Sequence, residues 1–412
     1  MKIIKDKTKQ GVPIYAYYIP HAKSVTLTVV VKAGTRNELW PKEAGLAHAM
    51  EHMVLRGTED FANEKDLSFF VEHIGGSVYA STSKECTKYK SCVPSTHIEK
   101  AVYVLSQIVR KPLLRKKDVG IEMNIVLQEL MADNDSPDEL TNIEYIKAIF
   151  GKHPLALETG GLKNTILNLR RADFKRWQRN FYRPENLAFF VIGNFDMRKL
   201  KKLFERYFPE NIKSKNDANF TLAPQPVKKS LYFIRNTKQA YIYFGAMTPG
   251  ADHPDSQPLD IFDIMISGGI SSPLFQEIRG KRGLAYSVRA INFIYKEAGF
   301  FVTQIETDPH KVEEVIKASL EVMKRSKNSS TLMSTAKEMT IGQLKIASDN
   351  YDDFLDMAIN DFNVFGRVVT LEEKINKIKA VTIEQISQAV EKYLLDENRR
   401  VIVVLGPKPK RK

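Results

Sequence analysis

The feature that most constrains the fold of this chain is an internal repeat. Asn186 precedes an apolar run that ends at Gly193, and 212 to 213 residues later Asn398 precedes a similar run that ends at Gly406. Two further pairs of segments match at a similar offset, namely a strand pattern at 25–31 with 241–244 and a helical pattern starting near His97 with one starting near His310. We therefore expect two copies of one unit, each about 200 residues long and each with its own core.

Hydrophobic periodicity indicates that each copy mixes strands and helices. Alternating or continuous apolar residues predict strands at 25–31, 77–89, 187–192, 231–234, 240–244, 285–295 and 299–305. Helical spacing predicts helices at 64–73, 98–110, 118–135, 171–181, 196–207, 258–266, 311–324 and 383–394, with Asp196 as the N-cap of its helix. Short turns separate several strands, which implies antiparallel neighbours. The pattern predicts an α+β fold rather than a doubly wound parallel sheet.

The division between the two copies falls in a polar stretch at 209–226, which is rich in Asn, Lys, Ser and Pro. The length of 412 residues is also too great for one ordinary core. We expect an N-terminal domain at 1–210, a linker at 211–227 and a C-terminal domain at 228–412.

Composition excludes several classes of protein. The chain is 43% hydrophobic, as globular soluble proteins are, and no run of eighteen uncharged apolar residues is present, so we expect no membrane partner. The first residues lack the apolar core of a signal peptide. Cys86 and Cys92, six positions apart, cannot form a disulfide framework and fit a reducing compartment. We therefore expect a cytoplasmic protein.

The net charge of +13 raises the question of nucleic-acid binding. The basic residues are spread along the chain, and no nucleic-acid-binding module is visible. The basic cluster Lys408–Lys412 has the character of a frayed chain end. We therefore expect no nucleic-acid partner.

The segment His48-Ala49-Met50-Glu51-His52 places metal-binding groups together. On a helix, residues four apart share a face, so both imidazoles can reach one cation, and Glu51 projects from that face too. Zinc binds neutral imidazole readily, and a carboxylate beside a zinc-activated water is a usual general base of metalloproteases. The order HxxEH is the inverse of the commoner HExxH. A metal-free interpretation is less favoured, because two His and a Glu on an apolar helix are costly to bury without a shared partner.

A third ligand has to come from elsewhere in the chain. The predicted helix at 118–135 carries Glu122 and Glu129, seven residues apart and therefore on one face. Glu129 follows His52 by 77 positions. A helical Glu considered alone is usually a solvated surface residue, so its assignment depends on the wider pattern.

That wider pattern resembles the pitrilysin/insulinase family of zinc peptidases, the inverzincins, along nearly the whole chain. The matching stretches are the metal helix and its exit turn at 47–53 and 56–58, the second helix at 122–129, the substrate-strand region at 75–76 and 81–85, and a second signature at 274–288. The half-size, two-domain length is similar to that of the catalytic subunit of mitochondrial processing peptidase. The resemblance implies two homologous α+β domains, each a mostly antiparallel sheet with helices packed on one face, which together form half of a clamshell.

The resemblance also implies roles for residues of the metal site. His48, His52 and Glu129 would hold one Zn²⁺ per chain and leave a fourth position for water. Glu51 would take the proton of that water. Glu122 would hydrogen-bond a ligand His and fix its tautomer.

Further roles follow for residues outside the metal helix. Arg279 and Tyr286, seven residues apart, match the pair that serves the reaction in the second signature: Tyr286 would donate to the oxyanion and Arg279 would hold the peptide. The strand edge at Tyr79, Ala80 and Ser81 would bind the substrate as an added strand. In larger relatives four such domains enclose a chamber, which implies that two chains pair here, either as a homodimer or with a related chain.

Two departures from the family pattern are present. Tyr79 stands where the family usually has Asn, and Pro273 follows Ser272 where relatives often carry Arg. The glycine-rich loop of the non-catalytic processing-peptidase subunit is not visible in the sequence. We expect a zinc-dependent endopeptidase that cleaves peptides or unfolded segments inside a chamber formed by two chains. The alternative is a catalytically idle assembly or scaffold subunit of the same fold.

Overall fold

The internal repeat corresponds to two sheets in the computed structural model, which describes residues 3–209, 224–225 and 227–408. The first sheet has the order β1-β2-β6-β3-β5-β4 and the second the order β7-β11-β8-β10-β9. Apart from β1, each strand of the first sheet has a counterpart in the second. The pairs β2–β6 and β7–β11 are parallel, and the other neighbours are antiparallel. The predicted α+β class with mostly antiparallel sheets is confirmed.

The strands are β1 (Ile3–Lys7), β2 (Pro13–Tyr18), β3 (Ser24–Val31), β4 (Ser77–Thr82), β5 (Thr87–Pro94), β6 (Leu187–Gly193), β7 (Lys229–Ile234), β8 (Ala240–Pro249), β9 (Ala285–Ile294), β10 (Ala298–Thr307) and β11 (Arg400–Gly406). The α-helices are α1 (Leu46–Leu55), α2 (Glu64–Glu72), α3 (Ile98–Arg110), α4 (Lys116–Asp135), α5 (Pro137–Phe150), α6 (Lys163–Asn168), α7 (Arg171–Phe181), α8 (Met197–Tyr207), α9 (Ser256–Ser267), α10 (Val312–Ser326), α11 (Ser330–Ala347), α12 (Tyr351–Phe365), α13 (Leu371–Ala380) and α14 (Ile383–Ala389). No described helix combines the length and the apolarity that crossing a bilayer requires.

The strand predicted at 77–89 is wrong as a single element, because the structure divides it into β4 and β5. Ser83 makes the turn between them: its hydroxyl accepts hydrogen bonds from the backbone N–H groups of Glu85 and Cys86. A Ser side chain that binds nearby backbone in this way competes with the sheet ladder and favours a turn. The expected N-cap is confirmed, since the Asp196 carboxylate accepts from the backbone N–H of Lys199.

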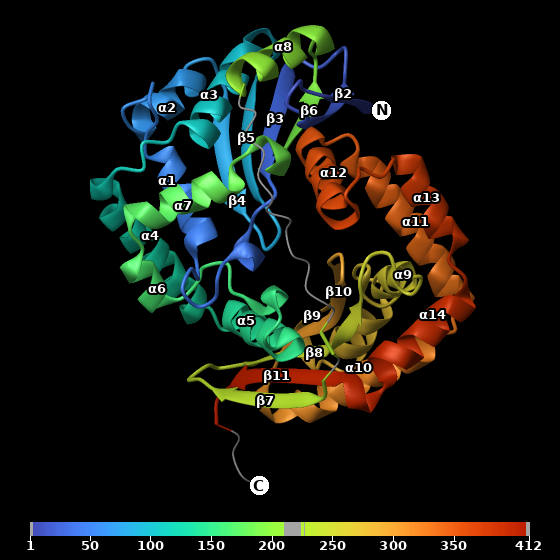
Figure 1. Ribbon diagram of the computed structural model, residues 1–412. Coiled ribbons are helices and arrows are strands. Elements are labelled where there is room, and N and C mark those ends of the chain that lie inside the picture. Colours follow the sequence, from blue (N-terminus) through green and yellow to red (C-terminus); the bar gives the residue numbers. More distant parts are fainter. Residues whose placement is uncertain (1–2, 210–223, 226, 409–412) are drawn as a thin grey trace. The chain divides into compact units, whose positions relative to one another are not determined.

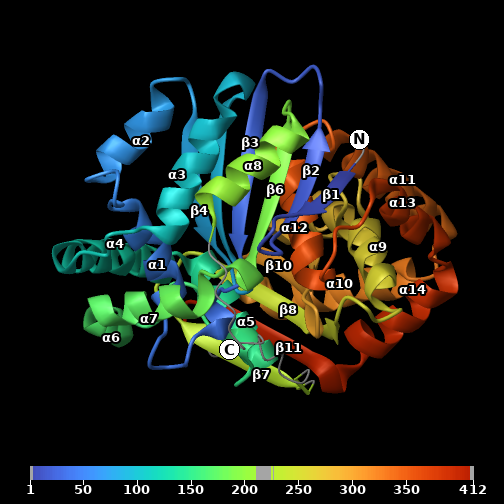
Figure 2. The ribbon, with the colours of Figure 1, turned by 45° about the horizontal axis from the view of Figure 1, so that its top comes forward.

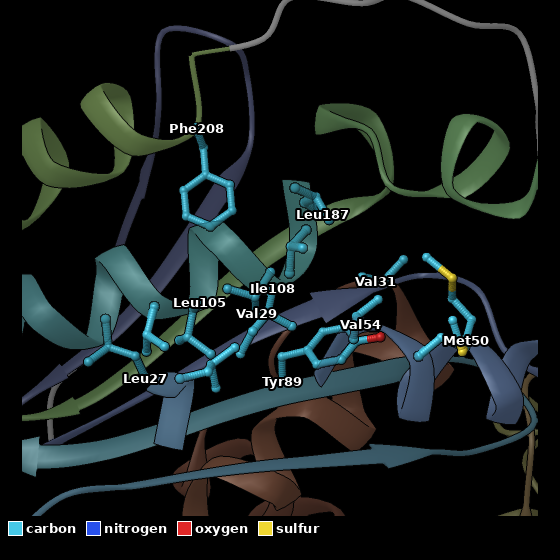
Figure 3. Packing of buried hydrophobic residues seen from close by; sticks show 14 of the residues in the cluster. Leu27, Val29, Val31, Met50, Val54, Tyr89, Leu105, Ile108, Leu187 and Phe208 are labelled. Atoms are coloured by element: carbon cyan, nitrogen blue, oxygen red, sulfur yellow. The ribbon is translucent and has the colours of Figure 1, made fainter. Parts of the chain in front are cut away.

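The first sheet packs one face against α3 and α8, which cross it in Figure 2. Side chains that alternate along the strands fill this core together with the apolar side of α1, as Figure 3 shows for Val29, Met50, Val54 and Tyr89. The helices predicted at 98–110 and 196–207 therefore cover one face of this sheet.

Contacts divide the chain into two compact units that are not continuous in sequence. Unit 1 contains the described residues of 1–132, 157–219 and 349–363, and unit 2 contains those of 133–156, 220–348 and 364–412. These units differ from the continuous domains expected at 1–210 and 228–412, because α5 belongs to unit 2 and α12 to unit 1. The linker expected at 211–227 lies outside the described residues, except for positions 224, 225 and 227.

The two exchanged helices, α12 in unit 1 and α5 in unit 2, lie on part of the second face of each sheet (Figure 1). In unit 1, the Phe354 ring of α12 lies 4.8 Å from the ring of Tyr17 on β2, and Phe362 lies 5.6 Å from Phe190 on β6. In unit 2, the Tyr145 hydroxyl of α5 donates to the carbonyl of Phe301 at 2.8 Å. Each unit thus has helices on one face and a further helix on part of the other.

Candidate metal centre

The helix that carries the HxxEH motif is fixed at its start and along one face. Gly45 precedes it with φ of 89°, a left-handed conformation that glycine adopts without strain. The Glu38 carboxylate accepts hydrogen bonds from the backbone N–H groups of Gly45 and Ala47, at 2.9 and 2.8 Å. The apolar side of the helix is fully buried in the unit 1 core through Leu46, Ala47, Ala49, Met50, Met53 and Val54. The other side presents the two His and Glu51.

Helix α4 brings the third ligand to this side. Its buried face includes Val119, Met123, Val126, Leu127 and Leu130, which belong to the same core. Glu122 is also buried, with only 4% of its surface exposed, whereas the Glu129 side chain is 48% exposed. The two carboxylates therefore meet different surroundings although they share a helix face.

The structure brings His48, His52 and Glu129 together. The two Nε2 atoms are 3.3 Å apart, and Glu129 Oε2 lies 3.6 Å from His48 Nε2 and 3.4 Å from His52 Nε2. Zinc bonds of about 2.0–2.1 Å at tetrahedral angles separate ligand atoms by about 3.4 Å. Within the described part of the chain, this is the one group of three or more His, Cys, Asp or Glu with such spacing. The triangle therefore fits a three-ligand zinc site.

Glu122 fixes the orientation of His52. Its Oε2 lies 3.2 Å from His52 Nδ1, and its Oε1 forms an ion pair with Arg56, whose Nε lies 3.1 Å away. With the Nδ1 proton directed at Glu122, the lone pair of His52 Nε2 points at Glu129 and His48. Three electron-rich atoms that face one another need a cation between them. The Glu122 carboxylate thus lies within hydrogen-bonding distance of His52, and its expected role in fixing the tautomer stays a prediction.

Glu51 lies on the same helix but has a different partner. The Thr82 hydroxyl of β4 donates to Glu51 Oε2 at 2.5 Å. Thr82 and Arg56 are the residues of the site that sequence reasoning missed. Both lay within stretches matched to the family, but nothing in their spacing indicated which carboxylate each would contact.

Burial and charge set the protonation of these groups. Burial, with a smaller effect of His52, lowers the pKa of His48 to about 4, so this ring is neutral near pH 7 and able to bind metal. Burial also acts to lower the pKa of His52, but the Glu122 hydrogen bond and the Glu129 and Glu51 charges outweigh it and raise that pKa. Burial raises the pKa of Glu51 against the opposing Thr82 hydrogen bond, as suits a general base.

The expected substrate strand is the edge of the first sheet. β4 pairs with β5 on one side only, and Tyr79 is 60% exposed. Thr82, at the end of β4, connects this edge directly to Glu51. An exposed edge of this kind has backbone N–H and C=O groups ready to pair with an extended peptide.

Arg279 and Tyr286 lie together in unit 2, whereas the metal ligands belong to unit 1. The Arg279 guanidinium carbon lies 4.4 Å from the centre of the Tyr286 ring, a cation–π contact. Arg279 lies in a π-helical turn at Phe275–Lys281, and Tyr286, 71% exposed, is the second residue of β9. The structure thus brings these two residues to each other.

Two family models match the chain. The model described as insulinase (peptidase family M16) matches residues 15–161, and the model described as peptidase M16 inactive domain matches residues 168–338. The HxxEH motif and Glu129 fall in the first match, and Arg279 and Tyr286 fall in the second.

Individual proteins resemble the chain over nearly its full length. An uncharacterised zinc protease of Bacillus subtilis is 27% identical over 389 residues, which cover 93% of this chain and 94% of that protein. The crystal structure of a protease from Helicobacter pylori has a TM-score of 0.91 at 20% identity and covers 98% and 99% of the two chains. A chain of complex III2 from Candida albicans has a TM-score of 0.83 at 17% identity, with 98% and 96% covered. These two structures share the fold with this chain.

Proposed function

Since this chain belongs to the insulinase family of peptidases (family M16), we propose that it is a zinc-dependent endopeptidase that cleaves peptides or unfolded segments. The observation that carries this proposal is the triangle of His48 Nε2, His52 Nε2 and Glu129 Oε2, with sides of 3.3 to 3.6 Å. The relative in Bacillus subtilis that is named a zinc protease supports the choice of metal.

The residues of unit 1 would divide the reaction between them. Bound zinc supplies an acidified water and a polarised substrate carbonyl. Glu51, held by Thr82, takes the proton of the attacking water and passes it to the leaving amine. Glu122 keeps His52 in the tautomer that binds metal through Nε2. The substrate backbone pairs with β4 at Tyr79, Ala80 and Ser81.

We also propose that the chamber forms from two chains, identical or related. Tyr286 would donate to the oxyanion and Arg279 would hold the peptide backbone, each acting on the metal site of the opposite chain. The chain has one HxxEH motif in its first copy and one Arg279–Tyr286 pair in its second. If four units enclose the chamber, as in the larger relatives that the sequence resembles, one chain would supply half.

Metal analysis combined with peptide cleavage tests the proposal. The purified protein should hold about one zinc per chain, and His52→Ala should hold none. Glu51→Gln should keep its zinc and lose cleavage of an unfolded peptide by at least about a hundredfold, because an amide cannot accept the proton. Wild-type protein that cleaves equally well without zinc would contradict the assignment.

The alternative is a catalytically idle assembly subunit of the same fold. The likeness to a chain of complex III2 supports this alternative, since that fold also occurs within a larger complex. The same experiment separates the two functions: an assembly subunit would hold its fold while cleaving no unfolded peptide, with or without added zinc.

A further inference from the structure

A pocket of about 360 Å³ lies beside the edge strand of unit 1. β4 contributes Tyr79 and Ser81 to its wall, β5 contributes Lys88 and Lys90, and α12 contributes Asp352 and Asp356. This volume is within the range of about 300–1,000 Å³ that is typical of ligand pockets. Its walls differ from those of the metal centre, which lies on the side of β4 to which Thr82 points.

The charged side chains of the pocket are arranged in two layers. Lys88 Nζ lies 2.7 Å from an oxygen of Asp356, and Lys90 Nζ lies 3.4 Å from an oxygen of Asp352. The two Lys side chains are 25% and 22% exposed, whereas the Asp side chains are 41% and 52% exposed. The carboxylates therefore form the outer, accessible charge of the pocket. They lie four residues apart and so project from one face of α12.

The geometry of strand addition places substrate side chains over this pocket. Successive residues of a strand point to opposite faces of its sheet. Thr82 points to Glu51, so Tyr79 and Ser81 point to the opposite face, where the pocket lies. A peptide paired with β4 has the same alternation. Every second side chain near the scissile bond would therefore lie over Tyr79 and the two Asp carboxylates.

We propose that this pocket binds a basic side chain of the peptide substrate and prefers arginine to lysine. The inference rests on the proposed peptidase function and names a substrate class for it. A planar guanidinium has five donors, which can reach the second oxygens of Asp352 and Asp356, and it stacks well on an exposed ring such as Tyr79. A lysine offers one compact charge with weaker stacking.

An acidic side chain fits the same walls poorly. It would meet the two carboxylates, whose side chains are the more exposed, and the ammonium groups of Lys88 and Lys90 are already paired with them. An arginine leaves both of those ion pairs intact. Tyr79, which stands in the place of the family's usual Asn, thereby acquires a specific role in this chain.

The test uses sets of unfolded peptides. Within a set the peptides carry arginine, lysine, citrulline or glutamate at one position, and this position moves along the peptide from one set to the next. Citrulline has nearly the shape of arginine but no charge. At one position, or at alternate positions, kcat/KM should be at least about tenfold higher for arginine than for citrulline. The double variant Asp352→Asn, Asp356→Asn should bring this ratio close to one. Asp353→Asn, the same change at an exposed neighbour on α12, should preserve it.

Each ratio compares kcat/KM for two peptides cleaved by the same protein preparation. A smaller fraction of folded enzyme in a variant lowers both values equally and leaves the ratio unchanged. A ratio near one at every position in the wild type, or a ratio that the double variant leaves unchanged, would overturn the pocket assignment. Cleavage of the citrulline peptides reports on the peptidase activity separately. If those are cut without any preference for arginine, the pocket assignment alone fails; if no peptide is cut, the proposed function fails with it. Tyr79→Leu should also lower the ratio of arginine to lysine, and an unchanged ratio would remove Tyr79 from the assignment.

Discussion

At the scale of single residues, the contact between Thr82 and Glu51 joins the proposed substrate-binding strand β4 to the proposed base. Glu51 is buried enough for its pKa to rise, and the hydroxyl of Thr82 is a donor that fixes one of its oxygens at 2.5 Å. A carboxylate that is free to rotate would be less well aligned with the attacking water, so the hydrogen bond favours a single productive orientation.

Thr82→Val should therefore lower kcat by about tenfold with little change in KM and with zinc content unchanged, because it removes one hydrogen bond to a charged group and keeps the shape of the side chain. Thr82→Ser should restore most of the rate, since it keeps the hydroxyl. Steady-state kinetics on an unfolded peptide measure both. A serine variant as slow as the valine variant would show that the hydroxyl has no part in the reaction.

Glu122 gives a prediction about metal affinity. Glu122→Gln keeps an oxygen that can accept from His52 but loses the charge that holds Arg56 and raises the pKa of His52. Zinc affinity should fall by about ten- to a hundredfold, as measured by competition with a chelating dye. Glu64→Gln, which removes the other carboxylate bound to Arg56, is the matched control and should bind zinc as the wild type does.

The grouping of His48, Glu51 and His52 could be predicted from the sequence because their relation is local, whereas Glu129 could be proposed only from the family resemblance. His48, Glu51 and His52 lie within two turns of one helix, and helical periodicity alone puts them on one side. Thr82 and Arg56 could not be assigned in the same way, since the partner of each is decided by how β4 and α4 pack against α1. That packing depends on tertiary contacts, which no spacing along the chain records.

At the scale of elements, α9 is the counterpart of the metal helix α1. Asp260 and Asp263 lie 212 residues after His48 and Glu51, so the second copy has two carboxylates in place of the motif. Asn292 on β9 donates to Asp260 through its side chain at 2.8 Å and to Asp263 through its backbone N–H at 2.9 Å. The pair thus holds the edge strand of the second sheet, much as Glu51 contacts β4 in the first.

Burial raises the pKa of Asp260 to about 7, against the opposing effects of Asn292 and Lys374, and raises the pKa of Asp263 with the help of the Asp260 charge. The folded state therefore binds these protons more tightly than the unfolded state does. The resulting stabilisation is complete below about pH 4 and is lost as the pH rises through about 7.

Asp260→Asn should accordingly raise the unfolding free energy of unit 2 by about 1–3 kcal/mol at pH 8, and its thermal midpoint should rise with it. At pH 4 the substitution should change the stability little. Thermal unfolding at the two pH values measures the difference, with the exposed Asp252→Asn as control. Equal destabilisation at both pH values would show that the acid is not protonated in the folded state.

Most strands and several long helices could be predicted because their apolar faces repeat regularly, whereas β1, β2 and α11 were not predicted. The helices α5 and α12 were not predicted. Each packs on the second face of a sheet, so the strands that it covers are apolar on both faces. The buried apolar residues of α12 recur at helical spacing, so periodicity indicates this helix, although not the sheet that it covers. The exchange of these helices between the units is a tertiary preference, for example of Phe362 for Tyr15 and Phe190, that periodicity does not encode.

At the scale of the whole molecule, the exchange predicts that a change in the C-terminal half destabilises the N-terminal sheet. Phe362→Ala should lower the stability of unit 1 by about 3 kcal/mol, because it leaves a cavity against β2 and β6. Faster amide exchange in those two strands, measured by mass spectrometry, would show it. Phe69→Ala, at an exposed site within unit 1 itself, should have a far smaller effect.

The proposed two-chain chamber predicts complementation between inactive variants. Glu51→Gln and Tyr286→Phe should each be nearly inactive alone, because one loses the proposed base and the other the proposed oxyanion donor. After subunit exchange, a mixed dimer would pair an intact Glu51 with an intact Tyr286 at one of its two sites, so part of the peptide-cleaving activity should return. Demonstrated exchange without any recovery would mean that each site is completed within one chain.

The reciprocal exchange of α5 and α12 bears on how a repeat of this kind can originate. A single copy of the repeat, made as a separate protein, would leave the second face of its sheet bare and its own exchanged helix without a sheet to cover. Two such copies would satisfy each other as a domain-swapped pair with two-fold symmetry. Gene fusion would then join partners that already depended on each other. Once fused, one copy could lose its metal ligands without loss of fold, because each helix contributes to the stability of the other copy.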